Sequence, residues 1–203
     1  MKIVLAGAGT AGHIEPALAV ADAWRQKFPK SEFEFVGTMA GLENSLVTGP
    51  GYKLSTIPKV TLPRSLNPAG LLAPLRFAQA LSKSLQIVDG ADCVVGFGGY
   101  VSAPIYLAAA LRRIEFVIHE ANAIPGWANK FGAFLGGAMA VGKSVKTGKF
   151  KGAEVVGLPL KPAISAALDL AKSDWPAARS SAKAKLGIKS SKPLILIMGD
   201  SQG

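Results

Sequence analysis

The sequence has little cysteine, little histidine and no long apolar run. Its 203 residues include a single cysteine, Cys93, and two histidines. A lone cysteine excludes a disulfide framework within the chain, and because Cys93 lies in the apolar run DCVVGF, we expect a buried core residue and not a nucleophile. No stretch approaches the roughly 18 apolar residues that a membrane-spanning helix needs. The first residues, MKIVL, are interpreted as a strand and not as a signal peptide, which predicts a cytoplasmic protein.

Charged and aromatic residues are also scarce, at 18% and 7%, against 49% hydrophobic residues. This composition excludes a disordered chain and predicts a globular protein of one large or two small domains. The net charge is +10. Residues 1–100 contain 9 basic and 7 acidic residues, whereas residues 101–203 contain 14 basic and 6 acidic residues. A basic surface favours phosphorylated ligands or anionic lipid. No nucleic-acid partner is expected, because basic helices interleaved with aromatic residues are not evident. The densest basic run, 143–153, is interpreted as a solvated loop.

Short apolar segments alternate with segments of helical periodicity along the chain. Helical spacing extends from Ile14 to Phe28, from Leu71 to Val88 and after Pro125. The alternation predicts an α/β fold with a Rossmann-like parallel sheet and helices on both faces. The predicted strands are 2–6, 33–36, 53–57, 92–97, 115–119, 138–141, 154–157 and 193–198.

A domain boundary is predicted within 155–164, where a strand ends at Gly157 and two prolines follow. A helical stretch, a capping Asp174 and a new apolar strand come next. A strand and turn without a following helix is an unfinished βαβ unit. We therefore predict a first domain over residues 1–160 and the beginning of a second Rossmann-like domain over 161–203.

The first predicted strand runs into a glycine-rich turn. Gly7, Gly9 and Gly12 satisfy the pattern G-x-G-x-x-G, in which backbone N–H groups at a helix N-terminus attract phosphate. A nicotinamide site also needs an acidic residue at the end of the second strand. Glu34 lies inside that strand, which ends at 36–38 without an acid. The turn therefore favours a phosphate ligand more than a dinucleotide.

A second glycine-rich turn, VVGFGGYVSAP, occupies 94–104 and precedes another helix. Both turns are expected at the carboxyl edge of the sheet, where two helix N-termini can hold a diphosphate between them. The same edge receives His119, Glu120 and Asn122. Because buried polar groups need partners, His119 is expected to be a structural hydrogen-bonding residue, and Asn122 either a loop cap or a ligand contact.

Seven segments, in order, resemble those of the bacterial family 28 peptidoglycan glycosyltransferases that add N-acetylglucosamine to lipid I. They cover nearly the whole chain: AGTAGHIEPALAVA, GTMAGLENSLV, GPGYKL, VVGFGGYVSAPIYLAA, HEANAIPGWANK, VVGLPLK and GDSQG. The resemblance implies a GT-B fold, in which the N-terminal domain binds lipid I and the C-terminal domain binds most of UDP-N-acetylglucosamine. It further implies inverting transfer that yields lipid II for the cell wall, without a cofactor, by a peripheral enzyme at the cytoplasmic face of the membrane.

The resemblance also implies roles for individual residues. His13 is assigned as the general base or as the residue that places it, and Glu120 as the residue that orients His119 or another loop group. Substrate contacts are assigned to Thr10, Ala11, Gly12, Gly98, Gly99, Tyr100, Ser102, Asn122, Lys161 and Ser201.

An enzyme whose acceptor carries a polyprenyl chain must act at the membrane surface. The segment 62–77 contains both leucines and arginines. Contact with anionic lipid is assigned to Arg64, Leu72, Arg76 and Phe77, with Leu75, Leu81 and Leu85 packed inward. The alternative is that the whole stripe is ordinary core. No histidine or cysteine cluster has metal-ligand spacing, so no metal is expected.

The chain departs from the family pattern at several positions. The family's G-G-T-G-G-H carries two extra methyl groups here, at Ala8 and Ala11, and its H-E-Q-N has Ala121, as in actinobacterial members. Lys161 replaces an arginine and lacks the bidentate fork of a guanidinium group. Asp200 puts a carboxylate in the predicted donor-phosphate turn.

Two other functions stay open. One is a non-catalytic module that holds a lipid pyrophosphate, and the other is a Rossmann oxidoreductase that binds NAD. With most of a donor domain missing, we expect this chain alone to bind acceptor and to transfer little or no sugar.

Overall fold

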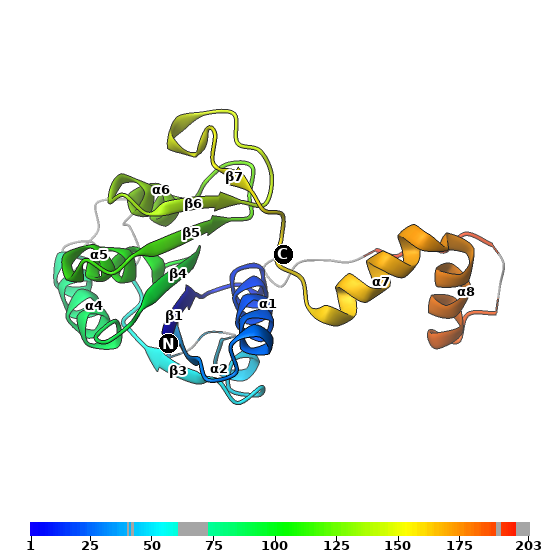
Figure 1. Ribbon diagram of the computed structural model, residues 1–203, viewed down its shortest axis with the longest axis horizontal. Helices are drawn as coiled ribbons and strands as arrows, with labels where there is room; N and C mark the ends of the chain where they lie inside the picture. Colours follow the sequence, from blue (N-terminus) through cyan, green and yellow to red (C-terminus); the bar gives the residue numbers. More distant parts are fainter. Residues whose placement is uncertain (40, 42, 61–72, 190–191, 198–203) are drawn as a thin grey trace. The chain divides into compact units, whose positions relative to one another are not determined.

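In the computed structural model, which describes residues 1–39, 41, 43–60, 73–189 and 192–197, the strands form one parallel sheet (Figure 1). The strand order is β3-β2-β1-β4-β5-β6-β7. The predicted α/β class is confirmed, and seven of the predicted strands form with ends within two residues of the prediction. Their bounds are β1 Lys2–Gly7, β2 Glu32–Gly37, β3 Lys53–Thr56, β4 Cys93–Gly98, β5 Phe116–Glu120, β6 Ala138–Val141 and β7 Glu154–Val155.

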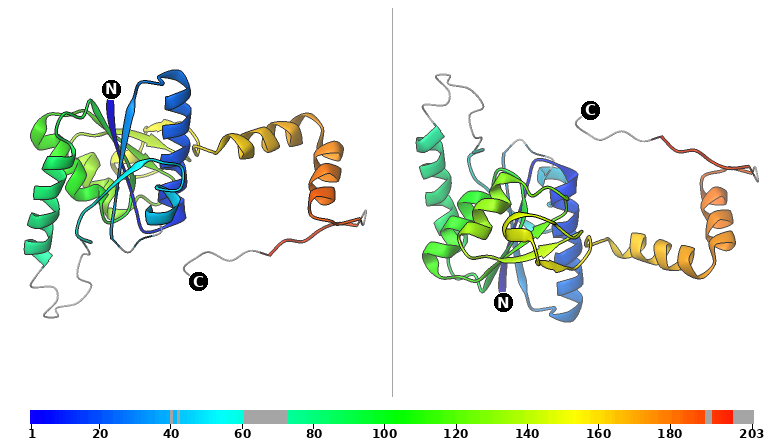
Figure 2. Two further views of the ribbon diagram at one scale, coloured as in Figure 1. Left: turned by 90° about the horizontal axis from the view of Figure 1, so that it is seen from below. Right: turned by 90° about the horizontal axis from the view of Figure 1, so that it is seen from above.

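Helices cover both faces of the sheet (Figures 1 and 2). Helix α1 (Ala11–Lys27) and the short α2 (Glu43–Leu46) pack on one face. Helices α4 (Ala73–Ile87), α5 (Ser102–Arg112) and α6 (Trp127–Phe134) pack on the other. This doubly covered arrangement explains why the strand sequences are nearly continuous apolar runs.

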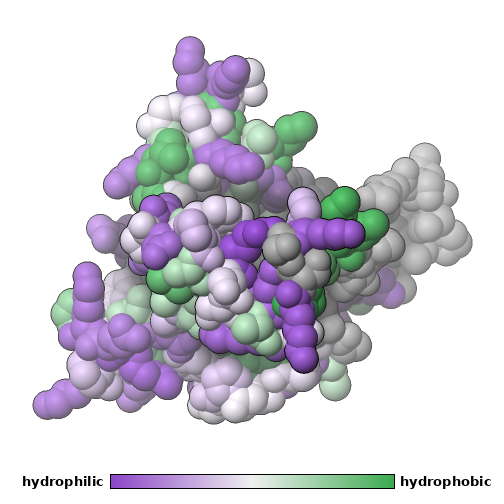
Figure 3. All heavy atoms as spheres, turned by 90° about the vertical axis from the view of Figure 1, so that its right-hand side faces the viewer, coloured by the Kyte–Doolittle hydropathy of each residue, from purple (hydrophilic) through white to green (hydrophobic). Residues whose placement is uncertain are grey.

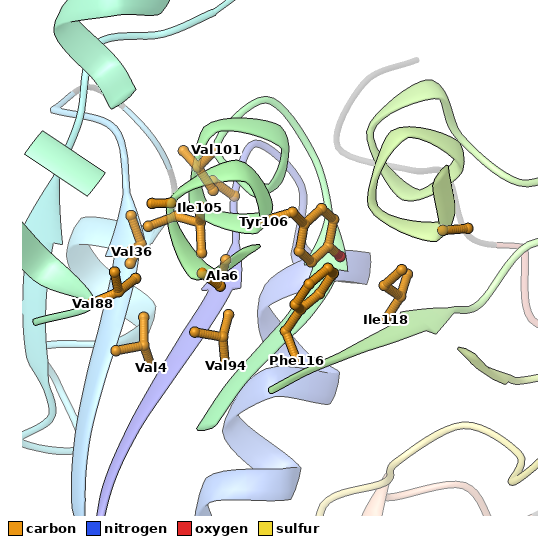
Figure 4. Close-up of a cluster of buried hydrophobic side chains, with 14 of the residues drawn as sticks. Val4, Ala6, Val36, Val88, Val94, Val101, Ile105, Tyr106, Phe116 and Ile118 are labelled. Carbon is orange, nitrogen blue, oxygen red and sulfur yellow. The ribbon is translucent and has the colours of Figure 1, made fainter. Parts of the chain in front are cut away.

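The side chains of strand β1 pack alternately against the helices on the two faces of the sheet. Ile3 and Leu5 belong to the cluster under α1, whereas Val4 and Ala6 belong to the cluster under α4 and α5. The alternation follows from the two-residue period of a strand. Figure 4 shows Val4, Ala6 and Val94 facing the α5 side chains Ile105 and Tyr106. Large buried side chains therefore fix the sheet between its two helical layers.

The chain reverses its direction of winding between β1 and β4. From β1 the chain proceeds outward through β2 to β3, and from β4 it proceeds the other way to β7. The connections after β1 and β4 therefore diverge and leave a crevice at the carboxyl ends of these neighbouring strands. Open α/β sheets bind ligands at such a switch point.

Helix α4 differs from its predicted orientation. Leu75 is 58% exposed, whereas Phe77 is partly buried and packs against the core together with Leu81 and Leu85. The inward position of Leu81 and Leu85 is confirmed, and the placement of Leu75 and Phe77 is wrong. Phe77, Leu81 and Leu85 follow one another at intervals of four and share a face, while Leu75 lies about 200° from Phe77 around the helix. Arg64 and Leu72 lie outside the described residues.

The chain divides into two compact units, Met1–Pro159 and Leu160–Gly203. The second contains α7 (Pro162–Ser173) and α8 (Trp175–Lys185). The predicted cap between them is confirmed, because the Asp174 side chain accepts a hydrogen bond from the backbone N–H of Ala177 at 2.9 Å.

The predicted strand 193–198 is wrong over its described residues. Residues 193–197 form no strand, and Ile195 and Ile197 are almost fully exposed. A strand needs a neighbouring strand to satisfy its backbone groups, and the described part of this unit contains no strand. Apolar composition alone therefore did not specify a strand here.

No described helix is long and apolar enough to cross a membrane. On the face drawn in Figure 3, separate hydrophobic patches lie among hydrophilic side chains.

Candidate functional site

A pocket of about 280 Å³ opens where the β1–α1 turn, the β4–α5 turn and the loop after β5 meet. The structure brings together six of the predicted site residues there, from three segments that are far apart in sequence. Thr10, Ala11 and Gly12 lie next to it, at the start of α1. The lining residues are His13, Gly98, Gly99, Tyr100, Glu120, Asn122, Gly126, Trp127, Ala128 and Asn129.

The β1–α1 turn needs glycine at two positions. A Cβ on Gly7 would lie 2.7 Å from the carbonyl oxygen of His13, so α1 approaches the strand closely only because Gly7 has none. Gly9 has a φ of +92°, a conformation that other residues rarely adopt. Gly12 has room for a side chain. The methyl group of Ala8 is buried in the core, so this departure from the family pattern does not narrow the pocket.

A buried carboxylate stands behind the same turn. Glu43 is fully buried and accepts hydrogen bonds from Thr38 N at 2.6 Å, Thr38 Oγ1 at 2.8 Å and Gly9 N at 3.4 Å. Its side chain fits because Gly37 has no Cβ, which would lie 2.3 Å from Glu43 Cγ. The N–H of Gly9 is therefore directed to the protein's own carboxylate. Sequence analysis assigned no role to Glu43.

His13 presents one ring nitrogen to the protein and the other to the pocket. Its Nδ1 lies 3.2 Å from the carbonyl oxygen of Ala8 and 3.2 Å from Thr10 Oγ1. Because a carbonyl oxygen only accepts, this contact favours the neutral tautomer with the proton on Nδ1. Nε2 faces Gly98, where a Cβ would lie only 3.2 Å away. The lone pair on Nε2 is thus directed to the pocket and can accept a proton there.

The β4–α5 turn is held by close backbone approaches. Gly98 and Gly99 have φ values of +95° and +84°, and a Cβ on Gly99 would lie 2.4 Å from the carbonyl oxygen of Ala8. The Ser102 hydroxyl is fully buried and donates to the carbonyl oxygen of Gly98 at 2.7 Å. Ser102 is not among the lining residues. The Ser102 hydroxyl therefore holds the turn, and its contact with the acceptor stays a prediction.

Glu120 holds the loop after β5. One carboxylate oxygen accepts from the backbone N–H and the side-chain amide of Asn122, at 2.8 and 3.0 Å. The other accepts from Gly126 N at 2.9 Å and Asn129 Nδ2 at 3.0 Å. Glu120 is 2% exposed, and its four hydrogen bonds offset the cost of burying the charge. Of the two groups that Glu120 was expected to orient, the loop is the one it contacts.

His119 is engaged elsewhere. Its Nε2 lies 2.9 Å from the carbonyl oxygen of Gly157, and the side chain is 5% exposed. The carbonyl oxygen requires a proton on Nε2, so the imidazole donates. The expectation of a structural hydrogen-bonding residue is confirmed.

Asn129 and Tyr106 extend the Glu120 network and were missed by sequence analysis. The buried Tyr106 hydroxyl donates to Asn129 Oδ1 at 2.9 Å, and Asn129 Nδ2 donates to Glu120. Burial raises the pKa of the Tyr106 hydroxyl, which keeps it a donor. The available signal was the polar Asn129 inside the apolar stretch GWANKF, where a buried amide needs partners.

The remaining predicted residues are not among those that line the pocket, or they lie outside the described residues. Lys161 stands at the N-terminus of α7 in the second unit, and Arg76 is exposed on α4. Ser201 and Asp200 lie outside the described residues. Burial raises the pKa of the Cys93 thiol, as suits a residue without a nucleophilic role. Within the described ranges, histidine, cysteine and acidic side chains form no group of three suited to a metal ion.

Comparison with known proteins gives consistent matches. Residues 3–140 match the glycosyltransferase family 28 N-terminal domain. Relatives from Frankia casuarinae and Thermobifida fusca are 47% and 45% identical over all of this chain and 52% of their own length. Both are named UDP-N-acetylglucosamine--N-acetylmuramyl-(pentapeptide) pyrophosphoryl-undecaprenol N-acetylglucosamine transferase. The chain spans about half the length of the curated relatives it matches.

Among solved structures, Acinetobacter baumannii MurG superposes with a TM-score of 0.64 at 27% identity, over 78% of this chain and 46% of that one. A UDP-GlcNAc 2-epimerase from Neisseria meningitidis gives a TM-score of 0.54 at 15% identity, over 94% of this chain and 55% of that one, which shows a shared fold alone.

Proposed function

Because this chain belongs to glycosyltransferase family 28, we propose that it is the acceptor-binding half of an inverting N-acetylglucosaminyltransferase of peptidoglycan synthesis. The donor is UDP-N-acetylglucosamine, the acceptor is the muramyl 4-hydroxyl of lipid I, and the product is lipid II. The observation that carries the proposal is the pocket at the switch point of the sheet, into which His13 directs Nε2.

The pocket supplies donors for an anionic acceptor. The diphosphate of lipid I lies between the two glycine-rich turns, close to the backbone of Gly98 and Gly99 and to Tyr100. The backbone N–H groups of Thr10, Ala11 and Gly12 at the start of α1 add positive potential at the same edge. The glycines allow the closest approach of a ligand to the backbone.

His13 then acts on the acceptor hydroxyl. Nε2 takes the proton of the 4-hydroxyl as its oxygen attacks the anomeric carbon of the donor sugar. The bond from that carbon to the UDP oxygen breaks, and the electron pair leaves with UDP. Asn122, Lys161 and Ser201 contact the donor, and Glu120 is a positioning residue that acts through Asn122.

Work on a polyprenyl acceptor places the enzyme peripherally at the cytoplasmic face of the membrane. The exposed neighbours Leu75 and Arg76 on α4 give this part of the surface an apolar and a cationic side chain together. Such a pairing suits contact with anionic lipid, and Arg64 and Leu72 are assigned to the same contact. Phe77 contributes less than expected because it packs partly against the core.

The NAD alternative is disfavoured by the contacts of Glu34. Its carboxylate accepts from Ser55 Oγ at 2.6 Å and pairs with Lys53 at 3.0 Å and Lys2 at 3.5 Å. A carboxylate occupied in this way is not available to a ribose hydroxyl. The non-catalytic pyrophosphate-binding module remains a second candidate, because every residue that lines the pocket lies within residues 3–140, which match the N-terminal domain of the family.

A binding titration of the purified chain tests the proposal. A soluble lipid I analogue, UDP-N-acetylglucosamine and NAD are titrated in parallel. We expect the analogue to bind and the nucleotide sugar to bind weakly. Tight NAD binding with none of the analogue would refute the proposal. Sugar transfer is assayed with the same samples, and full turnover would show that residues 1–203 suffice for catalysis.

A further inference from the structure

Lys59 lies beside the pocket without being one of the predicted site residues. It follows β3, and its Nζ lies 4.7 Å from the centre of the Tyr100 ring. Tyr100 is a lining residue. Lys59 itself is exposed, so its ammonium group can move while its backbone stays anchored by the nearby bond from Ile57 N to the carbonyl oxygen of Gly37 at 3.0 Å.

The Tyr100 ring connects this ammonium group to both glycine-rich turns. Tyr100 follows Gly99 directly in the β4–α5 turn. Its ring edge also lies against the β1–α1 turn, since a Cβ built on Gly9 would be 3.7 Å from Tyr100 Cε2. The cation of Lys59 is therefore held over a side chain that contacts both turns proposed to bind diphosphate.

Lys59 has no carboxylate partner within the part of the chain that the structure describes. The ion pairs there join Lys2 and Lys53 to Glu34, and Arg112 to Asp89. The two buried carboxylates near the pocket, Glu43 and Glu120, are already occupied by hydrogen-bond donors. An ammonium group over the face of an aromatic ring is held weakly at an exposed site, and a charge-assisted hydrogen bond to phosphate is stronger.

We propose that Lys59 is a further acceptor-binding residue, which turns from the Tyr100 ring to the diphosphate of the lipid-linked acceptor. The inference rests on the proposed function, because the proposed function supplies the ligand, a lipid-linked diphosphate. The shared chemistry is a diphosphate, which the donor UDP-sugar also carries, and the test separates these two sources. Since Lys59 and Tyr100 both belong to the acceptor-binding unit, the acceptor is the source that we assign.

The test compares Lys59→Met with Lys27→Met. Lys27 is an exposed lysine in the last turn of α1, at the opposite end of that helix from the pocket, so its variant loses the same charge elsewhere. Both variants and the wild type are titrated with a soluble lipid I analogue, with the same muramyl peptide lacking the diphosphate, and with UDP-N-acetylglucosamine. We expect Lys59→Met to weaken binding of the analogue about tenfold. Lys27→Met leaves binding of the analogue unchanged, and neither variant changes binding of the other two ligands.

A second readout is the salt dependence of binding. Losing a cation that contacts the ligand makes the affinity of Lys59→Met for the analogue less sensitive to salt than that of Lys27→Met. Lys59→Arg keeps the charge and restores most of the affinity. Circular dichroism confirms that each variant is folded.

The outcomes separate this inference from the proposed function. If the wild type binds the analogue and Lys59→Met binds it as well as Lys27→Met does, the role of Lys59 is refuted and the proposed function stands. If Lys59→Met weakens binding of the nucleotide sugar alone, the assignment to the acceptor is refuted. If the wild type does not bind the analogue, both proposals fail together.

Discussion

The side-chain amide of Asn129 donates a hydrogen bond to the carboxylate of Glu120 at 3.0 Å, and both side chains are buried. The Tyr106 hydroxyl donates to the other end of the same amide at 2.9 Å. Helix α5, helix α6 and strand β5 are thereby joined through one network, whose end is the loop that carries Asn122. A fully satisfied buried network holds a loop in one conformation, which prepares a site before its ligand arrives.

We expect Glu120→Gln to loosen this loop. A glutamine offers one oxygen to the four donors that now share two, and its amide group faces donors that it cannot satisfy. We expect a loss of about 2 kcal/mol in the free energy of unfolding and weaker binding of the lipid I analogue. Urea denaturation and titration measure the two effects. Glu154→Gln, a change at an exposed position on β7, is the control. Equal stability and equal binding of the analogue in the two variants would contradict the role of the network.

We expect Gly96→Ala to be strongly destabilising. A Cβ at this position in β4 would lie 2.0 Å from the hydroxyl oxygen of Tyr106, a fully buried side chain that cannot move aside without breaking its bond to Asn129. We expect a loss of about 3 kcal/mol in the free energy of unfolding, seen as a lower midpoint in thermal denaturation. Gly126→Ala is the matched control, because its Cβ would meet no atom within 4 Å. A Gly96→Ala midpoint equal to that of the control would show that the core yields more easily than the distances imply.

Most of the sheet could be predicted from the sequence. Strands such as β1 and β4 are buried on both faces, and a buried strand is an apolar run that ends at a turn. The glycine-rich turns could be predicted equally well, because the backbone geometry requires glycine at positions 7 and 9. Their meeting at one pocket followed from the rule that carboxyl ends of parallel strands share an edge.

The residues that were missed have partners that spacing does not reveal. Glu43 reaches Gly9 across 34 residues, and Tyr106 reaches Asn129 across 23. Lys59 meets Tyr100 only after β3 and β4 have taken their places in the sheet. Conversely, the apolar residues 193–197 matched a strand pattern, yet a pattern does not provide the neighbouring strand that pairing needs.

We expect Glu34 to make stability fall in acid. Burial raises the pKa of this carboxyl, but the hydrogen bond from Ser55 and the ammonium groups of Lys53 and Lys2 together bring it below the ordinary 4.5. A carboxyl whose pKa is lower in the folded state contributes stability above its unfolded pKa and loses it as the pH falls through the folded pKa. The contribution of Glu34 is therefore full at neutral pH, begins to fall near pH 4.5 and is lost as the pH falls through the lowered pKa of the folded state.

Urea denaturation of Glu34→Gln and Glu32→Gln checks this dependence. Glu32 is exposed on the same strand and serves as the control. Between about pH 7 and pH 4 we expect Glu34→Gln to lose less stability than the wild type, and Glu32→Gln to lose as much as the wild type. If the free energy of unfolding fell by the same amount with pH in all three proteins, Glu34 would not be a source of the acid sensitivity.

The two histidines of the chain should adopt opposite neutral tautomers. His13 Nδ1 lies against the carbonyl oxygen of Ala8, whereas His119 Nε2 lies against that of Gly157. Each carbonyl oxygen can only accept, so His13 carries its proton on Nδ1 and His119 on Nε2. Nitrogen-15 NMR spectra distinguish the tautomers, and His119→Gln assigns the signals.

If His13 proved to be protonated on Nε2, its lone pair would point to Ala8 and not to the pocket. Its role as the base on the acceptor hydroxyl would then have to be abandoned, while the proposal that the pocket binds the acceptor would be unaffected.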